Sequence, residues 1–226
     1  MAFKKVDLSD GNITMSAAYA TAPGSAMVRT AAGKAGAVKL TTETNVLGIV
    51  IDDPVQMTPN EGFYPANHPL SIKVEGKVRV NVIPNGADVN IEAGDYLEVA
   101  DVGSNNTGRH GLLEEAGSNA GATKTATSIA RALEDVTMGD EGYDVVSAVA
   151  VGDETVTFSS AAKLTAMDLS IGDYVLLEDL DGNVQLNRVK SIDSTTVIGL
   201  QIPATVVLNG STDLLTKVYQ VAAVLI

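Results

Sequence analysis

The sequence contains no cysteine and no tryptophan, and it has only two histidines, His68 and His110. Without cysteine there can be no disulfide, no thiolate nucleophile and no cysteine-based zinc or iron–sulfur site. Neither histidine has a partner at metal-ligand spacing, and no nucleophile-elbow or phosphate-loop motif occurs. We therefore predict no catalytic residue, no metal and no cofactor, and we expect the chain not to be an enzyme.

Basic residues are also few, with 15 Lys and Arg against 28 Asp and Glu, which gives a formal net charge of −13. A protein that follows a nucleic-acid backbone needs clustered cations, and the densest basic spot is Lys4-Lys5. We expect no direct contact with nucleic acid or with an anionic membrane. Solubility and self-repulsion at high concentration explain the acidity, and adaptation to high salt is the alternative.

Long apolar runs are missing too. No stretch of 18 or more apolar residues occurs, so we predict no membrane-spanning helix. The first residues, MAFKKVDLSDGN, carry two lysines without an apolar run after them, which is unlike a signal peptide. We expect synthesis in a cytoplasm.

Short segments of alternating apolar and polar residues are the main pattern that is present. They are separated by turns rich in Gly, Asp and Asn, which indicates small β-barrels or sandwiches. Aromatics are only 4% of the chain, so the core must consist mainly of Val, Leu, Ile, Ala and Met. The clearest segments are 70–76, 76–82, 91–99, 154–158, 170–178 and 184–192.

Three local patterns leave alternatives open. A Gly-Asp-Tyr corner occurs at 94–96 and again at 172–174, which fits either duplication or convergence. The segment 129–136 fits a helix or a strand. The acidic turn 179–183 contains part of a calcium-loop pattern, but a β-hairpin turn accounts for it.

The predicted fold is mostly β, with an extended N-terminal arm and two small β-barrel or β-tulip-like domains. Residues 1–45 form the arm and a first strand, because residues 13–40 have few large side chains. A plain flexible tail is the alternative there. Residues 46–151 form the first barrel, which residues 216–226 would complete, and residues 152–215 form the second.

The order of motifs resembles a known family. An apolar strand at 46–50 precedes an alternating strand pair, the phrase 91–95 ending in Gly-Asp, the phrase 129–135 ending in Ala-Leu-Glu-Asp, and a terminal Val-rich strand. This layout resembles the small head-decoration, or capsid cement, proteins of tailed bacteriophages and their archaeal relatives, over about residues 10 to 151. The resemblance implies a β-tulip or β-barrel, and a strand rather than a helix at 129–136. It also implies trimers seated where major capsid proteins meet, which hold the expanded shell against the pressure of the packaged DNA.

On this resemblance we expect a virion structural protein on the capsid surface. Its partner would be the major capsid protein, and it would form a homotrimer. Apolar residues of the arm, namely Ile13, Met15, Met27 and Val28, are the predicted capsid contacts. A surface carbohydrate-binding or adhesive module is the first alternative, and a virion-associated hydrolase is the second.

Overall fold

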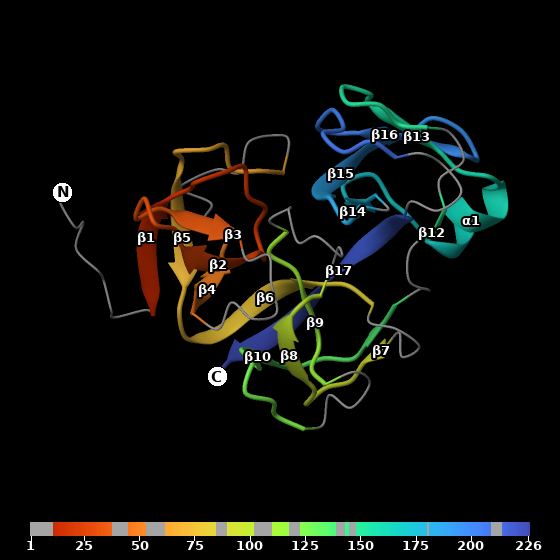
Figure 1. The fold of residues 1–226 in the computed structure, drawn as a ribbon. Coiled ribbons are helices and arrows are strands. Elements are labelled where there is room, and N and C mark those ends of the chain that lie inside the picture. The colour runs from red at the N-terminus through yellow and green to blue at the C-terminus, as the bar shows by residue number, and fades with distance from the viewer. Residues whose placement is uncertain are drawn as a thin grey trace.

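The computed structural model describes residues 11–37, 45–52, 62–84, 90–101, 110–117, 123–138, 143–144, 148–179, 181–208 and 214–226. Its elements are nearly all strands, which confirms the predicted mostly β class (Figure 1). The helix α1 (Ala161–Ala166) is short and spans six residues. In the described residues, no helix is long and apolar enough to cross a membrane.

The N-terminal part of the chain forms an antiparallel sheet of five strands in the order β1-β5-β4-β2-β3. β1 pairs with β5 in an unbroken register from Asn12–Lys73 to Ser16–Pro69. Just beyond β1, an isolated bridge joins Ala17 to Ala35 and brings the two edges of the sheet together at one end. The strands are β1 (Asn12–Ser16), β2 (Ala26–Arg29), β3 (Ala35–Ala37), β4 (Val46–Val50) and β5 (Pro69–Lys73).

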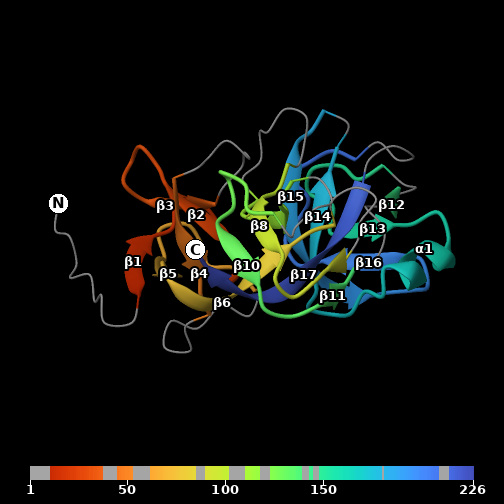
Figure 2. The same cartoon turned by 90° about the horizontal axis from the view of Figure 1, so that it is seen from below.

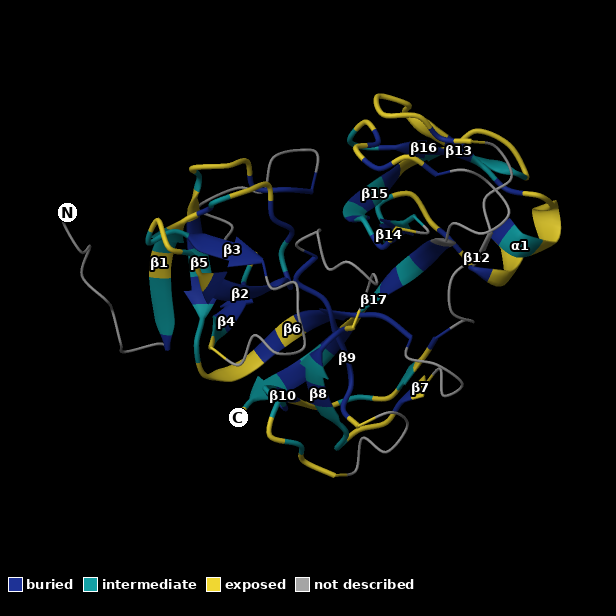
Figure 3. Ribbon diagram, viewed as in Figure 1, coloured by how far each residue is buried: buried dark blue, intermediate teal, exposed yellow. Residues whose placement is uncertain are grey.

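The prediction of an extended arm is therefore wrong for residues 12–37. The small side chains that suggested a poor core fill the inside of this sheet, where Ala17 and Ala35 are fully buried beside Met27. Figure 3 shows β2 and β3 among the buried strands. The predicted domain boundary at residues 45 and 46 also falls inside this sheet, because β4 and β5 pair with β2 and β1.

A central unit follows and packs a second apolar core. Its strands are β6 (Gly76–Val82), β7 (Asn90–Ile91), β8 (Tyr96–Val99), β9 (Leu113–Glu115), β10 (Ala130–Ala132) and β11 (Val136–Thr137). The next strand, β12 (Tyr143–Asp144), pairs instead with Leu214 and Leu215 at the distal end of the molecule. β10 lies within 129–136, so the strand interpretation of that segment is confirmed. β9 was not predicted, because its surroundings are rich in Gly, Asn and Ser. Its Leu113 is fully buried and bridges β6 in parallel through Val82.

A distal unit contains β13 (Thr155–Thr157), α1, β14 (Tyr174–Glu178), β15 (Val184–Ile192) and β16 (Val197–Leu200). These strands pair antiparallel in the order β14-β15-β16-β13. They enclose a separate apolar core that includes Phe158, Leu177 and Ile198. Instead of closing a second barrel, the described strands continue the ten-stranded sheet that contains the central unit.

The last strand, β17 (Leu214–Leu225), belongs to both units. Its first half pairs with β14, from Leu214–Glu178 to Val218–Tyr174. Its second half pairs with β6, from Tyr219–Val82 to Leu225–Gly76, and its end also pairs with β10. Figure 2 shows β17 running between these neighbours. The predicted return of residues 216–226 to the earlier unit is thus present, but the same strand also completes the distal unit.

Truncation of buried side chains on β17 should destabilise both units together. Leu215 lies in the distal core and Val221 in the central core, and both are fully buried. We expect Leu215→Ala to lower the free energy of unfolding by about 2–5 kcal/mol and Val221→Ala by about 1.5–3 kcal/mol. Each variant should shift one common transition in urea, followed by circular dichroism.

The control is Ile226→Ala, because Ile226 is 50% exposed. That variant should change the free energy of unfolding by less than about 0.5 kcal/mol. Two separate transitions, each shifted by only one of the core variants, would show that β17 does not couple the units.

Candidate functional site

A cleft of about 840 Å³ lies where the N-terminal sheet, the central unit and the distal unit meet. Its lining includes two aromatic rings, three cations and two carboxylates. The described lining residues come from seven separate stretches of the chain, so only the folded molecule brings them together. They are Pro23, Gly24, Val50, Ile51, Asp52, Gly62, Val78, Arg79, Gly172, Asp173, Tyr174, Arg188, Lys217, Val218, Tyr219 and Gln220.

One wall of the cleft is the corner Gly172-Asp173-Tyr174, which leads into β14. Gly172 has a φ of +100°, a conformation that favours glycine. The Asp173 carboxylate closes the turn by accepting the backbone N–H of Ser170 at 2.9 Å. Val189 holds the corner to β15, since its carbonyl accepts from the Gly172 N–H and its own N–H donates to the Asp173 carbonyl, both at 2.8 Å.

Arg188 of β15 is held against this corner. Its Nε donates to the Gly172 carbonyl at 2.7 Å, and its guanidinium lies 5.7 Å from the centre of the Tyr174 ring. Neither Nη nitrogen donates a hydrogen bond to a described residue. A guanidinium fixed through Nε and its flat face, with Nη groups still available, can bind an oxyanion with two donors.

Tyr174 joins the distal unit to the segment before β5. Its hydroxyl donates to the Gly62 carbonyl, and its ring meets Phe63 edge-on at 5.6 Å between centroids. Burial raises the pKa of Tyr174 to about 12; the Arg188 charge opposes this rise and the Asp52 carboxylate adds to it. The neutral phenol therefore remains the donor to Gly62 at ordinary pH.

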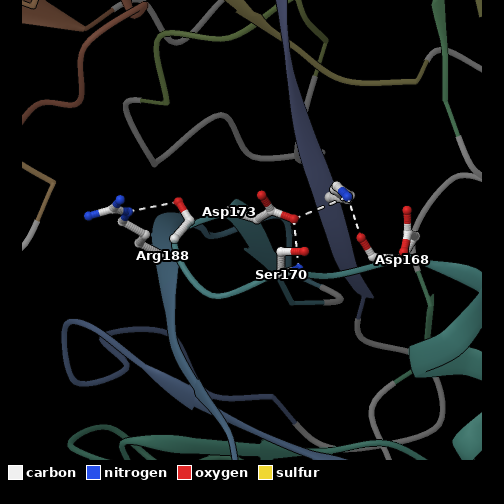
Figure 4. A network of polar contacts seen from close by, with 6 residues as sticks. Asp168, Ser170, Asp173 and Arg188 are labelled. Atoms are coloured by element: carbon white, nitrogen blue, oxygen red, sulfur yellow. Dashed lines mark hydrogen bonds and ion pairs between the residues drawn. The ribbon is translucent and has the colours of Figure 1, made fainter.

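Figure 4 shows the network of polar contacts around Asp168, Ser170, Asp173 and Arg188. Lys217 of β17 takes part in it, and its side chain is only 16% exposed. Its Nζ lies 3.1 Å from the Asp173 carboxylate and donates to the Asp168 carbonyl at 2.5 Å. Arg79 of β6 differs, because its side chain is 63% exposed and lies 3.7 Å from Glu134. Such an exposed ion pair is weak. Arg79 and Arg188 are thus the cations that remain most available to a ligand.

The corner at 94–96 repeats this arrangement outside the cleft. Arg131 of β10 donates from Nε to the Gly94 carbonyl at 2.7 Å and lies 5.5 Å from the Tyr96 ring centre. Asp95 accepts the N–H of Glu92 at 2.7 Å. Because the two corners share their turn, their tyrosine and their arginine, the recurrence noted in the sequence extends to three-dimensional structure.

A third corner of the same type was missed in the sequence. The Asp153 carboxylate accepts the N–H of Ala150 at 2.8 Å, and Gly152 has a φ of +99°. Tyrosine and arginine are absent here, so the tripeptide did not identify it. A signal shared by all three corners is a buried apolar residue three positions before the glycine, and this pattern could have identified the third corner. These residues are Ile91, Val149 and Leu169.

The sequence candidates for chemistry are not brought into one site. His68 stacks on Tyr64 at 5.3 Å between ring centres, and buried His110 accepts the Leu112 N–H on Nδ1 at 3.0 Å. The Asp179 carboxylate accepts two hydrogen bonds from Asn183, as in the predicted hairpin turn. Across the described ranges, no group of three His, Cys, Asp or Glu residues could hold a metal ion.

The four predicted capsid contacts divide into two pairs. Met27 and Val28 are buried in the molecule's own sheets, so in this conformation they offer little surface to a partner. They were predicted to face a partner because this segment was predicted to be an extended arm, whereas it forms part of a sheet. Ile13 and Met15 lie on the edge strand β1 and are half-buried, so part of each side chain remains accessible.

Loss of the Tyr174 hydroxyl should destabilise the molecule, because the buried Gly62 carbonyl would lose its donor. We expect Tyr174→Phe to lower the free energy of unfolding by about 1–3 kcal/mol. Tyr96→Phe is the matched control, since Tyr96 occupies the equivalent corner without such a bond, and it should change that energy by less than about 0.5 kcal/mol. Equal losses in urea titrations of the two variants would contradict this role of the hydroxyl.

Tyr174 should also make stability depend on alkaline pH. Its pKa is about 12 in the folded protein against 10.0 for an ordinary tyrosine, so between these values the folded state holds a proton that the unfolded chain releases. The contribution is complete below pH 10 and is lost as pH rises towards 12. Tyr174→Phe should remove this part of the alkaline fall in stability, and with it the late step in a phenolate absorbance titration. An unchanged titration curve would contradict the assignment.

Similarity to known proteins does not assign a role to the cleft. No protein-family model, curated protein or solved structure matches the chain. The indications of a role for the cleft and its corners are therefore their geometry and charge.

Proposed function

We propose that this chain is a virion structural protein that decorates the capsid. It binds the lattice of the major capsid protein as a trimer and stabilises the head against the pressure of the packaged DNA. The proposal continues the resemblance of the sequence to capsid cement proteins. Its main support is the way in which two motifs of that resemblance meet in the fold.

The phrases 91–95 and 129–135 build one piece of structure. The Gly94 N–H donates to the Ala132 carbonyl at 2.9 Å, and the Ala132 N–H donates to the Asp95 carbonyl at 2.8 Å. The Asp135 carboxylate accepts the Ala93 N–H at 2.7 Å. Two short motifs far apart in the chain are weak signals separately. Because the two motifs contact each other directly in the fold, their joint occurrence in this order is a more specific signal than either motif alone.

The N-terminal sheet is the part that we assign to the shell. Its strand β1 is an edge strand that carries Ile13 and Met15, which pack partly against the sheet's own core and keep part of each side chain accessible. An edge strand can pair with a segment of a neighbouring protein through its main chain, and apolar side chains add contact area. Many such weak contacts, repeated by the symmetry of the lattice, would supply the binding energy without a catalytic site.

The carbohydrate-binding alternative has less support. Sugar clefts use exposed aromatic faces, but the rings of Tyr96 and Tyr174 lie beneath Arg131 and Arg188. Tyr64 is buried. Among the rings whose burial the structure describes, Tyr19 is the exposed one, at 55%, and one ring is not a platform.

The direct test is binding to shells assembled from the major capsid protein of the virus to which, on this proposal, the chain belongs. We expect the chain to co-sediment with expanded shells, to raise the temperature at which they rupture, and to scatter light as a trimer. A strict monomer that stays in the supernatant at every shell concentration would overturn the proposal.

Two variants test which unit contacts the shell. Met15→Gln should weaken shell binding by about tenfold, through the loss of apolar contact at β1. Ile171→Gln is the control, since Ile171 is 68% exposed on the distal unit, and it should leave binding unchanged. Thermal melts verify that both variants fold. The reverse pattern would assign the distal unit to the shell.

A further inference from the structure

The cleft is a locally basic place in an acidic molecule. The chain has a formal net charge of −13, yet among the described lining residues Arg79, Arg188 and Lys217 stand against two carboxylates, Asp52 and Asp173. Lys217 and Asp173 neutralise each other at 3.1 Å. Among the described lining residues, Arg188 and Arg79 then remain against the Asp52 carboxylate, and Arg79 also lies 3.7 Å from Glu134 outside the lining.

Arg188 is organised for binding before any ligand arrives. The Gly172 carbonyl and the Tyr174 ring fix its guanidinium, so little side-chain entropy remains to be lost. Its Nη groups make no hydrogen bond to a described residue, and a carboxylate is the acceptor that matches the geometry of such a fork. One available guanidinium suits a single carboxylate better than a chain of phosphates, which needs clustered cations.

The rest of the lining favours a polypeptide as the carrier of that carboxylate. Apolar walls suit aliphatic side chains, and they come from Val50, Ile51, Val78 and Val218. The cleft's volume of about 840 Å³ lies within the range of sites for short ligands. A sugar would meet no open aromatic face on Tyr174, because Arg188 covers its face and Phe63 meets it edge-on.

We infer that this cleft binds an acidic segment of a partner polypeptide, with a Glu or Asp carboxylate on Arg188 and Arg79 as the second cation. This site is separate from the shell contact assigned to β1, and its existence does not depend on the proposed function.

The chain offers a matched control for Arg188. Arg131 makes the same Nε hydrogen bond to a glycine carbonyl and the same contact with a tyrosine ring. It is not among the residues that line the cleft. Substitution of either arginine therefore disturbs an equivalent corner, but only Arg188 should affect binding in the cleft.

The test measures fluorescence anisotropy of a labelled Glu-Val-Glu-Val-Glu peptide with the full chain, and of the matching Gln-Val-Gln-Val-Gln peptide. The Glu peptide should bind and the Gln peptide should bind at least about tenfold more weakly. Arg188→Gln should weaken binding of the Glu peptide by about tenfold or more, and Arg188→Lys should restore only part of it because lysine lacks the fork. Arg131→Gln should leave the affinity unchanged within about twofold.

Arg79→Gln provides a second variant in case Arg188→Gln does not fold, because Arg79 is an exposed side chain with only a weak ion pair. It should weaken binding by about threefold, and added salt should reduce the wild-type affinity. Several results would overturn the inference: no binding of the Glu peptide, equal binding of the Gln peptide, equal losses in the Arg188 and Arg131 variants, or tighter binding of an oligogalacturonate than of the peptide. None of these outcomes bears on capsid binding, which is measured separately.

Discussion

The pairing of β17 with β14 at one end and with β6 at the other is the constraint on which most of this structure depends. One continuous backbone ladder fixes the distal unit relative to the central unit. It also forms the floor of the cleft, where Lys217 reaches Asp173 and Val218 lies opposite Tyr174. Because β17 follows all the other described strands in the chain, neither unit can complete its sheet until β17 has been added. The contacts of β17 are highly non-local, and such contacts slow folding.

The Gly-Asp corner is the second recurring element. In each copy the chain reverses direction before it enters a strand, and a backbone N–H in the turn needs a hydrogen-bond acceptor. The aspartate supplies that acceptor within the turn, and the facing strand supplies the rest. In two copies the corner also fixes an arginine over a tyrosine. The same device stabilises the central unit at Arg131 and presents a cation in the cleft at Arg188.

The distribution of cations explains how an acidic surface and a basic cleft coexist. Arg131, Arg188 and Lys217 each lie near a tyrosine ring, so three of the tyrosines help to position cations. A high net negative charge keeps the molecule soluble and self-repelling at the concentrations that assembly requires. A local reversal of sign in the cleft then permits a specific contact. These features suit a protein that works by binding, as in the proposed role on a capsid.

Local patterns were enough to place most strands and turns. Alternation with a period of two predicted β6, β14 and β15 because it reflects which face of a strand meets water, and the Gly-Asp corners follow from the φ preference of glycine and the turn chemistry of aspartate. Pairing partners depend on contacts between residues far apart, so the sequence pattern did not show that Ala17 and Met27 would be buried, or that Leu113 would start a strand. The cleft depends on tertiary structure for the same reason. Asp52, Arg79 and Arg188 have unremarkable local surroundings, and only the burial of distant strands against one another brings their charges around one space.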